Sequence, residues 1–109
     1  MLDSSLITSL TDLLGADQVL TSDEQVADRR HDYWVLSHLR SWAGVFTGRP
    51  GAVVRPQSTQ EVQAIMRLAS KTNTAVVPFG LGSGVCGGVQ PDQSVLLLDL
   101  SMLNQIHAI

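Results

Sequence analysis

A glycine-rich stretch constrains the fold of this chain more than any other feature of its sequence. Five of the nine residues from Gly80 to Gly88 are glycine, and residues 82–87 match the pattern G-x-G-x-x-G. Apolar segments flank the stretch at Ala75–Pro78 and Val95–Asp99, so strands are expected on both sides. Because glycine adopts positive φ without steric cost, successive backbone N–H groups in such a loop can converge on an anion.

Two common phosphate-binding loops do not fit the residues around the glycines. A Rossmann motif needs a helix that begins inside the glycines and an acidic residue about 20 positions on. Residues 89–94 lack helical apolar spacing, and Asp99 comes too early, at the end of a strand. A Walker loop ends in Gly-Lys-Ser or Gly-Lys-Thr, and no lysine follows Lys71. Two interpretations remain: a strand-to-strand loop whose amides and Ser83 hydroxyl hold a diphosphate, and a glycine-rich hairpin without a ligand.

Strand and helix patterns alternate from residue 52 onward. The expected strands are Ala52–Arg55, Ala75–Pro78, Val95–Asp99 and Ile106–Ile109. The first stops at Pro56, which has no N–H to donate to a ladder. Ser58 and Glu61 predict a helix with a capping box, in which Glu61 reaches back to the Ser58 amide, and the helix is expected to end near Asn73. Its buried face is expected to comprise Val62, Ile65, Met66 and Ala69.

The first 50 residues are expected to form a helical arm. Leucines at positions 2, 6, 10, 13 and 14 predict an amphipathic helix. Asp3 or Ser4 can cap it, and Gly15 can end it in a left-handed conformation. Residues 19–51 are expected to be irregular, with short helical turns, because glycines and a proline interrupt them. The predicted fold class is α+β, with an arm over 1–50 and a compact α/β unit over 51–109.

Charge and composition exclude several classes of partner. The net charge is −3 without a block of like charge, so neither nucleic acid nor an anionic membrane surface is an expected partner. Apolar runs are too short to span a bilayer and no signal peptide is recognisable, so a cytoplasmic location is expected. Cys86 is the only cysteine, and the three histidines lack the spacing of metal ligands, so neither a disulfide framework nor a metal site is expected.

Three stretches together resemble the start of the FAD-binding domain shared by vanillyl-alcohol oxidase and p-cresol methylhydroxylase (PCMH) relatives. They are residues 52–62 (AVVRPQSTQEV), 76–89 (VVPFGLGSGVCGGV) and 97–104 (LLDLSMLN). Within this family the chain is most similar to alkyldihydroxyacetonephosphate synthase-like proteins and to the flavin subunits of glycolate- and D-lactate-oxidising enzymes. The resemblance implies the first α/β subdomain of a PCMH-type FAD-binding domain, preceded by the helical arm.

The resemblance also implies FAD as the cofactor, with main-chain amides of the loop around its diphosphate. The residues at the matching positions are Pro78 and Phe79 beside the cofactor, Gly80, Leu81, Gly82, Ser83 and Gly84 on the diphosphate, and Gly87 and Gly88 where the backbone approaches closely. Some relatives bond the flavin through a histidine in this loop. Ser83 and Val85 stand at the candidate positions here, so non-covalent FAD is implied. Cys86 is expected to be a small apolar filler rather than a flavin link.

The chain is expected to be the FAD-binding part of a flavin-dependent oxidoreductase, acting on a 2-hydroxy acid or resembling alkylglycerone-phosphate synthase. Family members continue into a second half of the FAD domain and a substrate domain, so the resemblance implies an N-terminal fragment or split subunit. The expected partners are the remainder of the flavoenzyme, a partner subunit, or a second copy through an exposed sheet edge. The alternative is a non-catalytic binding module that keeps the fold without flavin.

Few side chains outside the glycine-rich loop are expected to have a catalytic or structural role. No catalytic acid, base or nucleophile is expected in this chain, because hydride transfer is the flavin's own chemistry. Arg29, Arg30 and Asp32 receive no assignment. The two tryptophans at positions 34 and 42 are expected to be core or interface anchors, and Asp99 is expected to cap a turn over 101–104.

Overall fold

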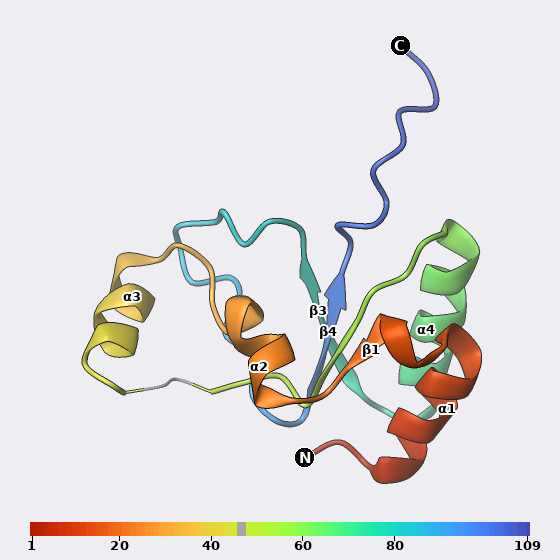
Figure 1. The fold of residues 1–109 in the computed structure, drawn as a ribbon, viewed down its shortest axis with the longest axis horizontal. Helices are drawn as coiled ribbons and strands as arrows, with labels where there is room; N and C mark the ends of the chain where they lie inside the picture. Colours follow the sequence, from red (N-terminus) through yellow and green to blue (C-terminus); the bar gives the residue numbers. More distant parts are fainter. Residues whose placement is uncertain (46–47) are drawn as a thin grey trace.

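A small mixed sheet organises the chain, as Figure 1 shows for a computed structural model that describes residues 1–45 and 48–109. The helices are α1 (Ser4–Leu14), α2 (Asp23–Val26), α3 (Val35–Trp42) and α4 (Thr59–Lys71), with 3₁₀ turns η1 (Ala16–Gln18) and η2 (Ala27–Arg29). The strands are β1 (Val19–Leu20), β2 (Ala52–Val54), β3 (Ala75–Phe79) and β4 (Val95–Asp99). This mixture of helix and sheet confirms the predicted α+β class.

The sheet has the strand order β1-β2-β4-β3. Strands β2, β4 and β3 are parallel, with Leu97 opposite Val53 on one side and Val77 on the other. Strand β1 pairs antiparallel with β2. All five residues of β4 are buried, as expected for a central strand covered on both faces. The carboxyl ends of β3 and β4 therefore lie side by side.

Two apolar cores pack against the two faces of the sheet. Helices α1 and α4 cover one face (Figure 1), where Leu10, Ile65 and Leu96 are fully buried. Helix α2 and the glycine-rich loop cover the other face, where Val26 and Phe79 pack with Leu97. Alternate residues of β4 point into opposite cores. The N-terminal arm thus contributes to both cores rather than lying apart from the sheet.

The two long helices follow the sequence pattern, with differences at their ends. The Asp3 side chain caps α1 at the Ser5 amide, as predicted. Gly15 ends α1 with a positive φ of 92°, which glycine tolerates, but its ψ of 155° lies outside the left-handed helical conformation expected. In α4 the Ser58 hydroxyl accepts from the Glu61 amide. The Glu61 carboxylate, however, accepts from the Gln57 amide at 2.7 Å and not from that of Ser58.

One apolar residue of α4 faces water. Ile65 and Ala69 are buried, but Met66 is 44% exposed, so its placement on the buried face was wrong. The other expected face residue, Val62, is partly buried and packs against the core with Leu68. The face of α4 that packs on the sheet therefore lacks Met66 and includes Leu68, which the i, i+3, i+4 spacing does not indicate.

Residues 19–45 contain more regular structure than expected. Strand β1 was not predicted, because two residues are too few to show a period. Helix α2 begins with a capping box formed by Ser22 and Gln25, and α3 extends over eight residues. No helix among the described residues is long and apolar enough to span a bilayer.

The expected strand at Ile106–Ile109 is wrong. Residues 103–109 adopt no regular structure, and every residue from 101 to 109 is exposed. Figure 1 shows the segment extending away from the sheet. Both sides of β4 are already paired, by β2 and β3, and residues 103–109 pair with neither edge strand of the sheet. An apolar and β-branched pattern does not make a strand without a partner.

Candidate functional site

The glycine-rich loop starts at the carboxyl end of β3 and returns to the start of β4. Residues 80–94 contain neither helix nor strand, so no helix begins within the glycines. This is the strand-to-strand connection expected from the sequence. In parallel α/β sheets, ligands bind outside the carboxyl ends of the strands. The first residues of the loop occupy this position next to the end of β4.

Backbone amides of the loop are almost all unused. Within the described part of the chain, the N–H groups of residues 80–87 make no hydrogen bond, and the Gly88 N–H donates to Oδ2 of Asp32 at 3.0 Å. A backbone N–H that lacks a partner must be satisfied by water or by a ligand. The loop therefore presents a run of free donors and no basic side chain of its own.

A cavity of about 420 Å³ opens at the start of this loop. Four of the nine residues expected at the site line it, namely Phe79, Gly80, Leu81 and Gly82. The other walls are Asp28, Arg29, His31 and Tyr33 from the segment before α3, and Asp99 and Ser101 from the end of β4. The remaining expected residues, Pro78, Ser83, Gly84, Gly87 and Gly88, are not part of its lining.

Two glycines of the loop are required by their surroundings. Gly82 has φ 65°, and an added Cβ would lie 2.6 Å from Cζ of Phe79. Gly87 has φ 74°, and its Cβ would lie 2.7 Å from Cε3 of Trp34. Gly80, by contrast, has open space within 4 Å. The free amides and the open space beside Gly80 fit a diphosphate, the group that the sequence resemblance implies.

Asp99 lines the cavity and accepts two hydrogen bonds there. Its Oδ2 accepts from Nε of Arg29 at 2.7 Å, and its Oδ1 accepts from the Ser101 amide at 2.9 Å. The second contact confirms that Asp99 caps the turn after β4. Burial raises the pKa of Asp99, but hydrogen bonds from Ser101 and Arg29 outweigh burial and hold the pKa below its ordinary value. Arg29 therefore has an anionic partner within the protein.

Asp32 has a structural role that the sequence did not reveal. Its side chain is 2% exposed. Oδ1 accepts from the Trp34 amide and Oδ2 from the Gly88 amide, both at 3.0 Å. The adjacent Tyr33 amide donates to the Gly84 carbonyl at 2.8 Å. No local sequence signal indicates a contact between residues 56 positions apart.

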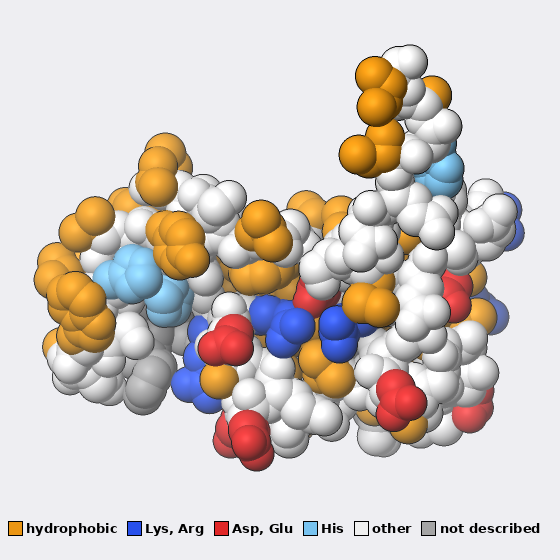
Figure 2. Space-filling model, turned by 45° about the horizontal axis from the view of Figure 1, so that its top comes forward, with side chains coloured by type: hydrophobic (Ala, Val, Ile, Leu, Met, Phe, Trp, Pro, Cys, Tyr) orange, Lys and Arg blue, Asp and Glu red, His pale blue; other side chains and the backbone are white. Residues whose placement is uncertain are grey.

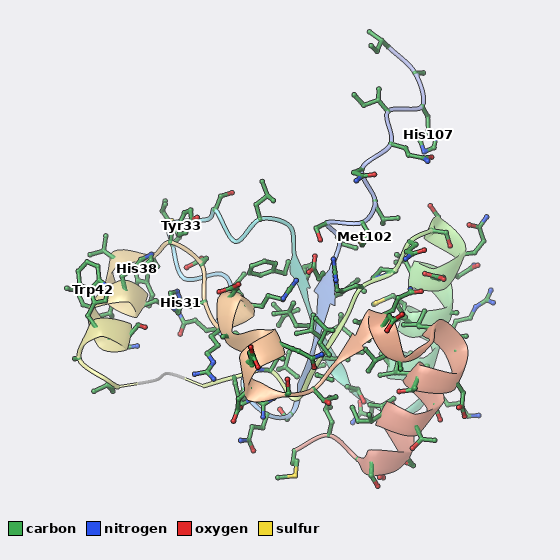
Figure 3. The ribbon with its side chains drawn as sticks, in the orientation of Figure 1. His31, Tyr33, His38, Trp42, Met102 and His107 are labelled. Carbon is green, nitrogen blue, oxygen red and sulfur yellow. The ribbon has the colours of Figure 1, made fainter. Side chains whose placement is uncertain are left out.

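An aromatic cluster extends from the cavity along α3. Figure 3 shows His31, Tyr33, His38 and Trp42 gathered there. The His38 ring centroid lies 5.1 Å from that of His31, 5.7 Å from that of Tyr33 and 6.2 Å from that of Trp42. Figure 2 shows these histidines surrounded by hydrophobic side chains. Trp42 is 80% exposed, so it is not a core residue, whereas Trp34 lies beneath Gly87.

Comparison with known proteins identifies the family. A family model described as an FAD binding domain matches residues 50–109, which is more than half of the chain. The chain belongs to the FAD binding domain family. The matched segment contains β2, α4, β3, the glycine-rich loop and β4. Residues 1–45 and 48–109 contain no group of three or more His, Cys, Asp or Glu side chains that could hold a metal ion.

Curated relatives carry the names of the enzymes that the sequence resembles. The chain is 34% identical over 61 residues to glycolate oxidase subunit GlcD of Bacillus subtilis (strain 168), and the match covers 56% of this chain and 13% of the relative. It is 37% identical over 84 residues to alkyldihydroxyacetonephosphate synthase of Trypanosoma brucei brucei, which covers 69% of this chain and 13% of the relative. The chain thus spans about an eighth of the length of these relatives.

Solved structures confirm the fold. An alkyldihydroxyacetonephosphate synthase aligns over the whole of this chain with a TM-score of 0.91 at 20% identity, using 21% of its own chain. Substrate-bound p-cresol methylhydroxylase aligns over 96% of this chain with a TM-score of 0.73 at 20% identity, using 19% of its own. The recognition of a PCMH-type FAD-binding fold from three sequence stretches is therefore confirmed.

Proposed function

We propose that this chain holds FAD non-covalently as the cofactor-binding part of a flavin-dependent oxidoreductase. The observation that carries the proposal is the row of unused amides over residues 80–87, at the carboxyl end of β3. Such donors bind phosphate oxygens without a basic side chain. Family membership identifies FAD as the ligand, and its diphosphate is the anionic group that converging backbone amides favour.

Different residues of the loop have different roles in binding FAD. Gly80, Leu81 and Gly82 line the cavity and supply amides to the diphosphate, and Ser83 and Gly84 continue the row of donors. Glycines 87 and 88 let the backbone approach closely, and Pro78 and Phe79 flank the cofactor. Flavin supplies the acceptor for a hydride when it is bound. The chain's own residues position the diphosphate and exclude water beside it.

The flavin is held without a covalent bond in this proposal. Ser83 and Val85 occupy the positions where some relatives carry a flavin-linked histidine, and neither side chain forms that bond. Cys86 is an exposed free thiol. Acid precipitation of the loaded protein is expected to release all flavin into the supernatant. Flavin that stays with the pellet, and is lost in Cys86→Ser, would contradict this.

The substrate class is proposed from the names of the curated relatives. Glycolate and D-2-hydroxyglutarate, named for two of the curated relatives, are both 2-hydroxy acids. We therefore propose a 2-hydroxy acid as substrate, with an alkylglycerone-phosphate-synthase-like reaction as the second choice. Residues 51–109 would form the first half of the FAD domain and residues 1–50 the arm that covers it. The remainder of the flavoenzyme, or a partner subunit, would supply the catalytic groups.

A binding module without flavin is the second candidate. Strand β3 forms one edge of the sheet, and such an edge can pair with another chain. Exposed apolar side chains of α3 form a separate surface, with Val35 at 68% and Trp42 at 80% exposure. These features favour contact with another chain, and they are compatible with FAD binding as well.

Calorimetric titration of the purified chain with FAD tests the primary proposal. We expect saturable binding that inorganic pyrophosphate competes away, because the loop amides recognise the diphosphate. Riboflavin, which has no phosphate, is expected to bind much more weakly. If FAD does not bind, or if riboflavin binds as well as FAD, the diphosphate is not the group that the loop holds.

A further inference from the structure

The glycine-rich loop has two halves with different surroundings. Its first half, residues 80–82, lines the cavity and has free amides. Its second half, residues 84–88, is wrapped around the Asp32 side chain. Oδ2 of Asp32 accepts from the Gly88 amide at 3.0 Å and lies 3.3 Å from the position that a Cβ on Gly84 would take. The second half therefore already encloses a carboxylate from the chain itself.

Three contacts fix this second half to the segment before α3. The Asp32 carboxylate bridges the Gly88 and Trp34 amides. The Tyr33 amide donates to the Gly84 carbonyl at 2.8 Å. The Trp34 ring lies so close to Gly87 that a Cβ there would be 2.7 Å from it. Three consecutive residues thus contact both ends of the segment from 84 to 88, and Gly87 next to its second end.

We propose that Asp32 is a positioning residue that holds the glycine-rich loop in the form that binds the diphosphate. The inference rests on the proposed function. A loop with few internal hydrogen bonds must be ordered before it can bind, and the entropy of ordering reduces affinity. By fixing residues 84–88, the carboxylate orders the loop in advance. The first half is then held at the cavity with its amides free.

The opposite role, a carboxylate that competes with the ligand for loop amides, fits the geometry less well. Asp32 is buried and does not line the cavity. Its partners are the amides of Trp34 and Gly88, and it takes none of the amides of residues 80–83. A competing carboxylate would have to occupy those donors. The two roles predict opposite changes in affinity when the carboxylate is removed.

Replacement of Asp32 by asparagine tests the proposal. Asp32→Asn keeps the shape of the side chain but replaces one acceptor oxygen by a donor, so the Gly88 and Trp34 amides cannot both be satisfied as before. We expect the dissociation constant for FAD to rise by roughly ten- to a hundredfold, the loss typical of a hydrogen bond to a charged group. Unchanged or tighter binding of FAD by this variant would overturn the proposal.

Asp92→Asn is the matched control. Oδ1 of Asp92 also accepts a backbone amide two residues on, that of Ser94 at 2.7 Å, but the turn it caps leads into β4 and lies outside residues 80–88. This variant should bind FAD as the original chain does. If Asp32→Asn does not fold, Asp32→Ser replaces it, since a serine hydroxyl can still accept from the Trp34 amide but is too short to reach Gly88. Its FAD affinity is expected to fall in the same way.

Amide hydrogen exchange gives a readout that needs no cofactor. In Asp32→Asn the Gly88 and Tyr33 amides should exchange faster, while the amide of Leu97 in the central strand stays protected. Equal exchange at Gly88 in both proteins would overturn the positioning role whether or not FAD binds. Failure of the original chain to bind FAD would instead contradict the proposed function, so the two failures are distinguishable.

Discussion

At Gly82 the backbone passes so close to the Phe79 ring that no side chain can be accommodated. The φ of 65° and the 2.6 Å approach of a Cβ to Cζ are two separate obstacles to any other residue. Alanine at such a φ costs about 1–2 kcal/mol, and the clash adds to that cost. Because the ring and Gly82 line the same cavity, relief of the clash must move the candidate binding surface itself.

We therefore predict that Gly82→Ala weakens FAD binding by about tenfold or more, equivalent to about 1.4 kcal/mol of binding free energy. Gly44→Ala is the matched control. Gly44 has φ 73° and no atom within 4 Å of an added Cβ, so this variant carries the same backbone strain away from the loop. Calorimetric FAD titrations should separate the two variants, while both lower the free energy of unfolding. Equal FAD affinities in the two variants would contradict the account.

Glycine positions and local contacts could be predicted from the sequence, but contacts between distant residues could not. Gly82 and Gly87 could be identified from the pattern because glycine is the residue that tolerates positive φ and close contact. Asp32 could not, because its role depends on a contact with Gly88 that only the folded chain creates. Similarly, the sequence predicted that Asp99 caps the following turn, a local contact, but not that Arg29 pairs with it from 70 positions away.

Among the elements, β4 is an inner strand of the sheet and packs into both cores. Leu96 and Leu98 point into the core beneath α1 and α4, and Leu97 points into the core beneath α2 and the loop. Parallel neighbours on both sides and a core on each face leave β4 almost no contact with water. Continuous apolar runs of this kind are typical of central parallel strands, and this is why the strand was predictable.

Truncation of Leu97 should destabilise the chain far more than truncation of an exposed residue of similar size. Leu97→Ala opens a cavity in a fully buried position and is expected to lower the free energy of unfolding by about 2–5 kcal/mol. Met66→Ala, at a site that is 44% exposed, is the control and should cost less than about 1 kcal/mol. Urea denaturation followed by circular dichroism measures both. A comparable loss in the two variants would show that β4 is not the centre of the packing.

Elements that depend on distant partners were the ones that sequence patterns missed. Strand β1 exists because Val19 and Leu20 lie beside β2, and two residues carry no readable period. The apolar residues of 106–109 have the composition of a strand but pair with neither edge strand of the sheet. Helices α1 and α4, whose hydrogen bonds are local, were placed to within a few residues of their observed ends.

For the whole molecule, the exposed edge of β3 predicts self-association. Backbone groups on an edge strand pair readily with another chain, and β3 ends the sheet on one side. We expect sedimentation velocity to show dimers that increase with concentration. Ala75→Lys places a charge on the exposed first residue of β3 and should shift the chain toward monomer. Ser9→Lys, on the exposed face of α1, adds the same charge elsewhere and should not. A monomer at every concentration would contradict the prediction.

The central claim, that loop amides grip the diphosphate of FAD, is tested most directly by NMR titration of the ¹⁵N-labelled chain. We predict that the amide resonances of residues 80–84 shift most on addition of FAD, with smaller shifts in residues 85–87, while the Gly88 amide, already bonded to Asp32, shifts little. Pyrophosphate alone should reproduce the shifts of residues 80–84. Binding of FAD that leaves those amides unmoved and shifts another surface would contradict the account.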